Sequence, residues 1–169
     1  MKALVLKDKR QFEMTDIPEP QAGPGEARIA VKTVGLCGTD VHIYDGQFSH
    51  RLKYPTVIGH EFAGVVDQIG EGVTHLGLGQ RVVADPTLPC GTCAWCQRGE
   101  LNYCPDVKVI GVDRDGAMAE KIVVPAHKVH ALPESVSFVH GPLAELYSVA
   151  CRAVTRAQVE PGDVVVVLG

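Results

Sequence analysis

The sequence contains no long apolar run, no cluster of basic residues and no recognisable targeting signal. Its longest apolar string, residues 164–168, is far shorter than the roughly twenty residues that a membrane-spanning helix needs. The net charge is -4, with 20 acidic and 16 basic residues, so nothing marks a surface for nucleic acid or an anionic membrane. The first residues do not resemble a secretory signal. We therefore expect a soluble, cytoplasmic, globular protein with no nucleic-acid or membrane partner.

Four of the six cysteines lie in one short segment, residues 89–105. The gaps between them are two, two and seven residues, and the cysteines are Cys90, Cys93, Cys96 and Cys104. Four thiolates suit tetrahedral zinc and fill its coordination sphere, which favours a structural site over a catalytic one. The alternative is a disulfide framework, but a reducing compartment favours metal for such spacing. The segment is predicted to be a lobe folded around a structural zinc ion.

Short β-branched runs separated by turns make up most of the chain. The 18 glycines and 11 prolines are scattered between these runs rather than clustered. This texture favours a compact β-barrel or sandwich over repeated strand-helix units. Strands are expected at residues 3–6, 27–31, 64–69, 81–84 and 120–124.

The pattern changes after residue 137. Apolar residues recur at helical spacing from about 142 to 155, so a helix is expected there, with Cys151 packed inside its apolar face. Residues 164–168 read as a strand of the kind buried in a parallel sheet, and such a strand needs neighbours. We therefore expect one domain over residues 1–155, then a linker and the first strand of a truncated domain over 156–169. A fragment of this kind would expose apolar surface where missing parts pack.

A second set of possible metal ligands is dispersed along the chain: Cys37, His60, Glu61 and Glu145. Catalytic zinc usually takes three protein ligands of mixed Cys, His and carboxylate type and keeps one position open. Taken singly, each residue has an ordinary explanation. A buried cysteine is often a small hydrophobic residue, and a glutamate on a helix is often on its solvated face. Spacing alone leaves this site open.

Three motifs carry a family resemblance. The run GHEFAGVVDQIGEGV at residues 59–73 resembles the signature of zinc-containing alcohol dehydrogenases in the medium-chain dehydrogenase/reductase family. The run CGTDVH at residues 37–42 and the four-cysteine segment match it too, in the family's order. The resemblance implies a mainly β protein with short helices, a GroES-like, partly open β-barrel catalytic domain. It also implies a following Rossmann domain, whose first strand residues 164–169 resemble.

The resemblance assigns roles to the dispersed ligands. It makes Cys37 and His60 ligands of a catalytic zinc, and Glu61 a ligand or an exchanging partner. Glu145 falls at the remaining ligand position, which is a cysteine in many alcohol dehydrogenases and a glutamate in polyol-type members. The glutamate points towards polyol (sorbitol) or L-threonine dehydrogenases. Which of the two carboxylates binds the metal stays open.

The resemblance also implies the chemistry. A secondary alcohol of a polyol, sugar or threonine-like substrate would form a zinc alkoxide and give a hydride to NAD or NADP, becoming a ketone. Thr39 and His42 would relay the released proton to solvent. Two zinc ions are expected per chain, the full-length protein is expected to be a homo-dimer or tetramer, and the fragment alone is expected to be inactive.

Two other classes of protein compete with this interpretation. A non-enzymatic binding or assembly module stabilised by zinc would need only the four-cysteine lobe. A nucleic-acid zinc ribbon is disfavoured by the acidic balance of the chain. The sequence does not choose the alcohol, or NAD over NADP.

Overall fold

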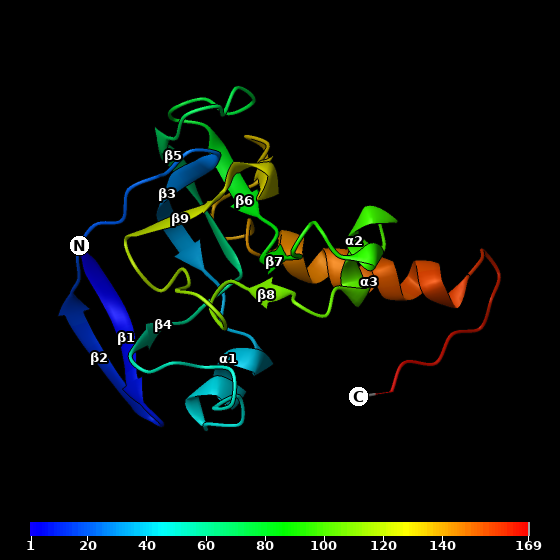
Figure 1. The fold of residues 1–169 in the computed structure, drawn as a ribbon. Coiled ribbons are helices and arrows are strands. Elements are labelled where there is room, and N and C mark those ends of the chain that lie inside the picture. The colour runs from blue at the N-terminus through cyan, green and yellow to red at the C-terminus, as the bar shows by residue number, and fades with distance from the viewer. Residues whose placement is uncertain (169) are drawn as a thin grey trace.

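Short strands in three sheets form the body of the molecule, and this computed structural model describes residues 1–168 (Figure 1). The five-stranded antiparallel sheet has the order β10-β6-β5-β3-β9. Its strands are β3 (Glu26–Val34), β5 (Phe62–Ile69), β6 (Arg81–Ala84), β9 (Lys121–Pro125) and β10 (Val129–Ala131). The other two sheets are β2-β1-β4, with β1 (Lys2–Asp8), β2 (Gln11–Asp16) and β4 (Thr56–Val57), and the pair β7 (Thr87–Leu88) and β8 (Lys108–Val109). The prediction of a mainly β fold is confirmed.

Two apolar clusters hold these sheets together. The larger cluster lies against the five-stranded sheet, and its largest fully buried side chains are Ile29, Phe62, Val66, Val82, Ile110 and Val124. The smaller cluster joins β1 and β4 to the helix α1 (Gly38–Tyr44), through Leu6, Ile43 and Ile58. Most of the residues in these clusters are β-branched or aromatic, types that pack well on pleated strands, which explains why the strand runs were recognisable in the sequence.

The register of β3 and β5 determines where the site forms. The two strands pair antiparallel up to Val34 opposite Phe62. The residues just after β3 therefore lie beside the residues just before β5. The first group includes Cys37 and the second includes His60 and Glu61, the expected zinc ligands. The approach to β5 passes through Gly59, whose φ of 93° is a conformation that glycine adopts without strain. A Cβ at Gly116 would lie 2.3 Å from the Gly59 carbonyl oxygen, so the backbone is packed closely here.

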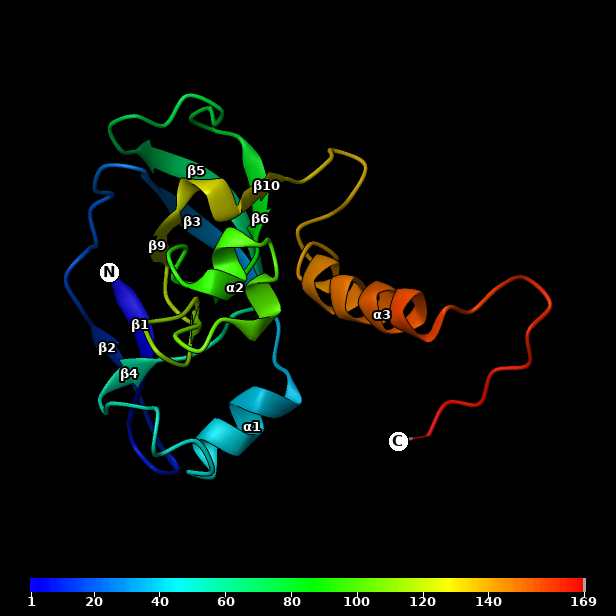
Figure 2. The ribbon, with the colours of Figure 1, turned by 45° about the vertical axis from the view of Figure 1, so that its right-hand side comes forward.

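The helices are few and mostly short. Besides α1 they are α2 (Ala94–Gln97), α3 (Leu143–Ala157) and two 3-10 turns, Leu101–Tyr103 and Ala126–Lys128. The helix expected at 142–155 is thus confirmed as α3, which extends away from the β-rich body (Figure 2). No residue of α3 is buried and its apolar stripe is exposed. The prediction that Cys151 packs inside this face is wrong, because the face has no partner among residues 1–168.

The segment after α3 differs from the expected buried strand. Residues 164–168 have no regular secondary structure and their side chains are exposed; Gly169 lies outside the described residues. A strand requires a neighbour for its backbone hydrogen bonds, and no described strand pairs with this segment. Among the helices of residues 1–168, none has the length and apolar character to cross a bilayer.

Candidate metal centres

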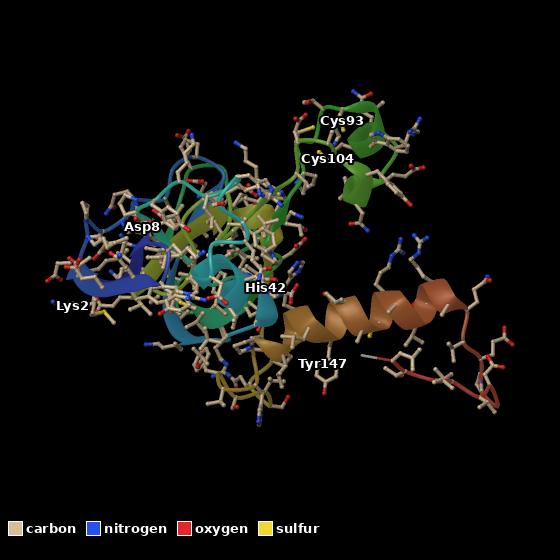
Figure 3. All side chains as sticks on the ribbon, turned by 90° about the horizontal axis from the view of Figure 1, so that it is seen from below. Lys2, Asp8, His42, Cys93, Cys104 and Tyr147 are labelled. Atoms are coloured by element: carbon tan, nitrogen blue, oxygen red, sulfur yellow. The ribbon has the colours of Figure 1, made fainter. Side chains whose placement is uncertain are left out.

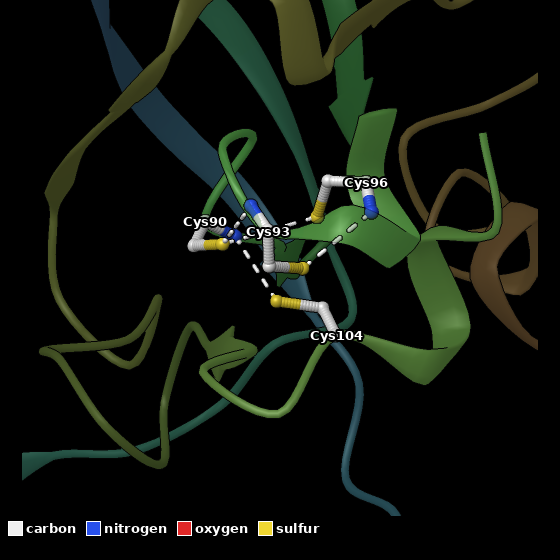
Figure 4. A group of neighbouring side chains, drawn as sticks. All are labelled: Cys90, Cys93, Cys96 and Cys104. Carbon is white, nitrogen blue, oxygen red and sulfur yellow. Dashed lines mark hydrogen bonds between the residues drawn. The ribbon is translucent and has the colours of Figure 1, made fainter. Parts of the chain in front are cut away.

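The four cysteines of the lobe converge on one point, as Figure 4 shows. Their Sγ atoms come from the loop after β7, both ends of α2 and the end of the 3-10 turn that follows it. The Sγ atoms of Cys90 and Cys96 are 3.9 Å apart. Two thiolates on tetrahedral zinc, at Zn–S distances of about 2.3 Å, lie about 3.8 Å apart, whereas a disulfide bond is about 2.05 Å long. All four cysteines are free, so the arrangement fits a metal and not the disulfide alternative.

Backbone N–H groups surround these sulfur atoms. Cys93 N donates to Cys90 Sγ at 3.4 Å, and Cys96 N donates to Cys93 Sγ at 3.5 Å. Hydrogen bonds from the backbone of Thr92 and Cys93 lower the pKa of Cys90 to about 6. Burial raises the pKa of Cys96 to about 12. Donors of this kind stabilise the thiolate, which is the form that binds metal. A bound cation would offset the free-energy cost of burying the Cys96 thiolate.

A second cluster forms where β3 ends and β5 begins. The ligand atoms of Cys37, His60 and Glu61 all lie within 4.8 Å of one another. Cys37 Sγ is 3.4 Å from His60 Nε2, close to the about 3.6 Å that a sulfur and a nitrogen would have on one tetrahedral zinc ion. The His60 Nδ1 atom is buried and has no hydrogen-bond partner among residues 1–168. It is the contact with Cys37 Sγ that shows the ring presenting Nε2 to the cluster, as a zinc ligand would.

The electrostatics of this cluster also fit a cation. Burial raises the pKa of the Cys37 thiol and of the Glu61 carboxyl above their ordinary values. The His60 ring lowers the pKa of Glu61 in part, and the nearby carboxylates of Glu145 and Asp40 raise it further. Buried anionic ligands are costly without a positive partner. Three donors of mixed type leave one tetrahedral position free, which is the pattern of catalytic rather than structural zinc.

The helix α1 positions the first ligand. Cys37 is its N-cap residue, and the Asp40 Oδ2 atom accepts a hydrogen bond from the Cys37 backbone N–H at 2.9 Å. Asp40 is buried, and sequence reasoning did not single it out. An acidic residue three positions after an N-cap is a capping signal that could have identified it. The other two residues of interest on α1 are three positions apart, on one face: Thr39 is half-buried and His42 is exposed.

The structure does not bring Glu145 into the second cluster. This residue lies in the first turn of α3, where its half-buried side chain lines a cavity of about 700 Å³ together with Asp85, Asn102 and Arg152. Gly141 and Pro142, just before α3, are buried, and Gly141 lies beside Ala63 of β5, whereas no residue of α3 itself is buried. Among the described residues, Glu61 is the carboxylate grouped with Cys37 and His60, and a ligand role for Glu145 stays a prediction.

Figure 3 shows Cys93 and Cys104 in a lobe that stands apart from the barrel, with His42 on the barrel side.

Comparison with known proteins identifies relatives that cover most of the chain. The family described as "Alcohol dehydrogenase GroES-like domain" matches residues 23–134. A 2-dehydro-3-deoxy-L-galactonate 5-dehydrogenase from Pseudoalteromonas atlantica is 44% identical over 89% of this chain and 43% of its own length. A sorbitol dehydrogenase from Arabidopsis thaliana is 39% identical over 89% of this chain and 42% of its own.

A solved structure agrees with the fold. The rspB alcohol dehydrogenase from Escherichia coli CFT073, crystallised with NADH, is 39% identical and superposes with a TM-score of 0.86, over 94% of this chain and 46% of its own. The expected GroES-like fold is confirmed by these matches. The chain spans about half the length of the curated relatives it matches.

Proposed function

Because this chain belongs to the zinc-type alcohol dehydrogenases and forms their GroES-like domain, we propose that it supplies the catalytic zinc site of an NAD(P)-linked dehydrogenase. The substrate would be a secondary alcohol in a polyol, a sugar or a hydroxy amino acid such as L-threonine, and the product a ketone. The single observation that carries the proposal is the convergence of Cys37, His60 and Glu61 from separate parts of the chain.

The residues of the second cluster would hold the ion through Cys37 Sγ, His60 Nε2 and a Glu61 oxygen. When bound there, zinc acts as a Lewis acid that lowers the pKa of a coordinated hydroxyl and polarises a carbonyl in the reverse direction. Asp40 supports this set by fixing the Cys37 backbone. Burial of His60 and Glu61 keeps water from competing for the same donors and strengthens the field at the site.

Proton transfer would use the two residues on α1. A hydroxyl both accepts and donates, so Thr39 could take a proton from the substrate oxygen and pass it outward. An imidazole can both accept and donate a proton, and the exposure of His42 suits delivery of that proton to solvent. The two side chains share one helical face, which supports this order of transfer.

Two features favour a polyol-type substrate. Glu145 stands where the family resemblance places the last ligand of polyol-type members, and the Arabidopsis relative is named a sorbitol dehydrogenase. The hydride acceptor, NAD or NADP, would bind in the part of the full-length protein that this chain does not cover. For that reason the 169-residue chain alone would not oxidise alcohols. The full-length enzyme would assemble as a homo-dimer or tetramer.

The test uses the full-length protein. Polyols, sugar alcohols and L-threonine are each supplied with NAD or NADP, and formation of the reduced nicotinamide is followed by its absorbance. Zinc is counted per chain by elemental analysis. The wild type is expected to bind two zinc ions and to oxidise at least one of these alcohols. His60→Asn is expected to lose one ion and the activity, because a neutral amide is a poor zinc ligand.

A matched control separates this outcome from general damage. His127 is an exposed histidine of the Ala126–Lys128 turn, so His127→Asn should keep both ions and full activity. A wild-type protein that binds one ion, lost on replacing Cys93, and that oxidises none of these alcohols would instead support the zinc-stabilised binding or assembly module.

A further inference from the structure

Gly35 lies between the end of β3 and the first ligand, Cys37, directly beside Glu61. Its N–H donates to the Glu61 carbonyl oxygen at 2.6 Å. This bond continues the β3–β5 ladder by one step beyond the pair Val34 and Phe62. The two residues are therefore cross-strand neighbours, and side chains at such positions contact each other directly.

Gly35 has no side chain, and the Glu61 side chain fills the space where one would be. A Cβ at Gly35 would lie 2.5 Å from Glu61 Oε2, 3.1 Å from Glu61 Cβ and 3.5 Å from the Glu61 carbonyl oxygen. The first of these distances is far below van der Waals contact, and the atom concerned is a carboxylate oxygen of the zinc cluster. A methyl group at position 35 would have to push that carboxylate aside.

The backbone itself does not require glycine at this position. Gly35 is not among the residues with positive φ, in contrast to Gly59. An alanine could adopt the backbone conformation of Gly35. The absence of a methyl group at this position therefore serves to leave room for the Glu61 side chain. The Glu61 carboxylate is the far end of a flexible side chain, so its displacement would relieve the shortest contact, and a small local shift would relieve the 3.1 Å contact with Glu61 Cβ.

We propose that Gly35 is a positioning residue for the catalytic zinc site, because its lack of a side chain lets the Glu61 carboxylate lean against β3 within reach of Cys37 and His60. The role is indirect, since glycine offers no ligand atom. It rests on the proposed function, in which Glu61 is a ligand or exchanging partner of that ion. Residues that orient metal ligands typically change metal affinity by about 10- to 100-fold when altered.

The experiment measures zinc release from the full-length protein to a chromogenic chelator, for the wild type, Gly35→Ala, Glu61→Ala and the double variant. Gly35→Ala is expected to release its catalytic zinc about tenfold faster or more, and to alter the visible spectrum of cobalt placed in that site. The four-cysteine site should release its zinc at the wild-type rate in every variant and so reports that the fold is intact.

The double variant tests the mechanism. Once Glu61→Ala has removed the carboxylate, the methyl at position 35 loses its 2.5 Å contact and keeps only the 3.1 Å contact with the Cβ of residue 61, so adding Gly35→Ala should cause little further change in release. Gly38→Ala is the matched control, because Gly38 also adjoins Cys37 and a Cβ there meets nothing within 4 Å. Its release rate should equal that of the wild type.

The outcomes separate the two claims. If the wild type binds only the lobe's zinc, the proposed function fails and the role of Gly35 fails with it. If the wild type binds two ions and Gly35→Ala behaves as Gly38→Ala, or if its effect persists undiminished in the Glu61→Ala background, the role of Gly35 alone is overturned. Should Gly35→Ala not fold, the double variant decides: folding of the double variant supports the proposal, and its failure overturns it.

Discussion

A partly buried network of four charges links β3, β5 and β9, and its most informative perturbation is Asp67→Asn. Arg28 Nε donates to Asp67 Oδ1 at 2.8 Å, and Lys121 Nζ lies 3.1 Å from Asp67 Oδ2. The Arg28 side chain is only 11% exposed and that of Asp67 24%. Both cations also reach Glu19, at 2.7 Å each. The substitution removes the negative charge while keeping the size of the side chain.

The size of the effect follows from what the cations retain. Removing one partner of a fully buried ion pair costs about 3–5 kcal/mol. Here Arg28 and Lys121 keep Glu19, the Arg28 guanidinium keeps the Pro20 carbonyl, and the site is partly solvated. We therefore expect Asp67→Asn to lower the free energy of unfolding by about 2 kcal/mol at neutral pH.

The pH dependence has a definite sign. Burial acts to raise the pKa of Asp67, but hydrogen bonds and charge from Arg28 and Lys121 outweigh it and hold the pKa below its ordinary value. A carboxyl whose pKa is depressed on folding contributes its full stabilisation above its unfolded pKa and loses it as the pH falls through the folded pKa. The difference between wild type and variant should be constant near neutrality and shrink in acid, below about pH 4.

Urea unfolding of the zinc-loaded 169-residue chain at several pH values measures this difference, with zinc held constant. The matched control is Asp16→Asn, which removes the same charge from the exposed pair with Lys2; exposed pairs contribute about 0–1 kcal/mol. The reasoning is refuted if Asp67→Asn costs no more than Asp16→Asn, or if its cost grows as the pH falls.

Three further predictions concern the lobe, the glycine packing and the proton route. Cys96→Ser should cost the chain one zinc ion and the protease resistance of the lobe while the second cluster keeps its metal, and loss of both ions on elemental analysis would contradict independent sites. Gly116→Ala should destabilise by about 1–3 kcal/mol in urea, because the methyl would meet the Gly59 carbonyl oxygen, and an unchanged midpoint would argue against this packing. In the full-length enzyme, Thr39→Val should lower kcat by about 100-fold or more with zinc content unchanged, and a wild-type kcat would remove Thr39 from the relay.

The strands and the lobe were predictable because their signals are local. The apolar runs that became β1, β3, β5, β6 and β9 alternate with glycine and proline, and the cysteine spacing indicates a metal by itself. The strands β2, β4, β7, β8 and β10 were missed, since strands of two or three residues and an exposed edge strand carry little pattern. The run 164–168 forms no strand among the described residues, because pairing depends on a partner that a local pattern cannot supply, and its role as the first strand of a further domain stays a prediction.

The candidate site was only partly readable from the sequence. Spacing could not bring Cys37 and His60 together, and the family resemblance supplied that step. The contact of Gly35 with Glu61 depends on the β3–β5 register, which no local motif encodes. For Glu145 the family resemblance identified the sequence position, but the location of its side chain in the fold depends on how α3 packs.

The central claim is that one ion binds between Cys37, His60 and Glu61, separately from the lobe. Anomalous diffraction at the zinc edge from crystals of the full-length protein tests it most directly. The account predicts two peaks per chain, one among the four cysteines and one in contact with Cys37 Sγ and His60 Nε2. A single peak in the lobe, from zinc-replete protein, would contradict it.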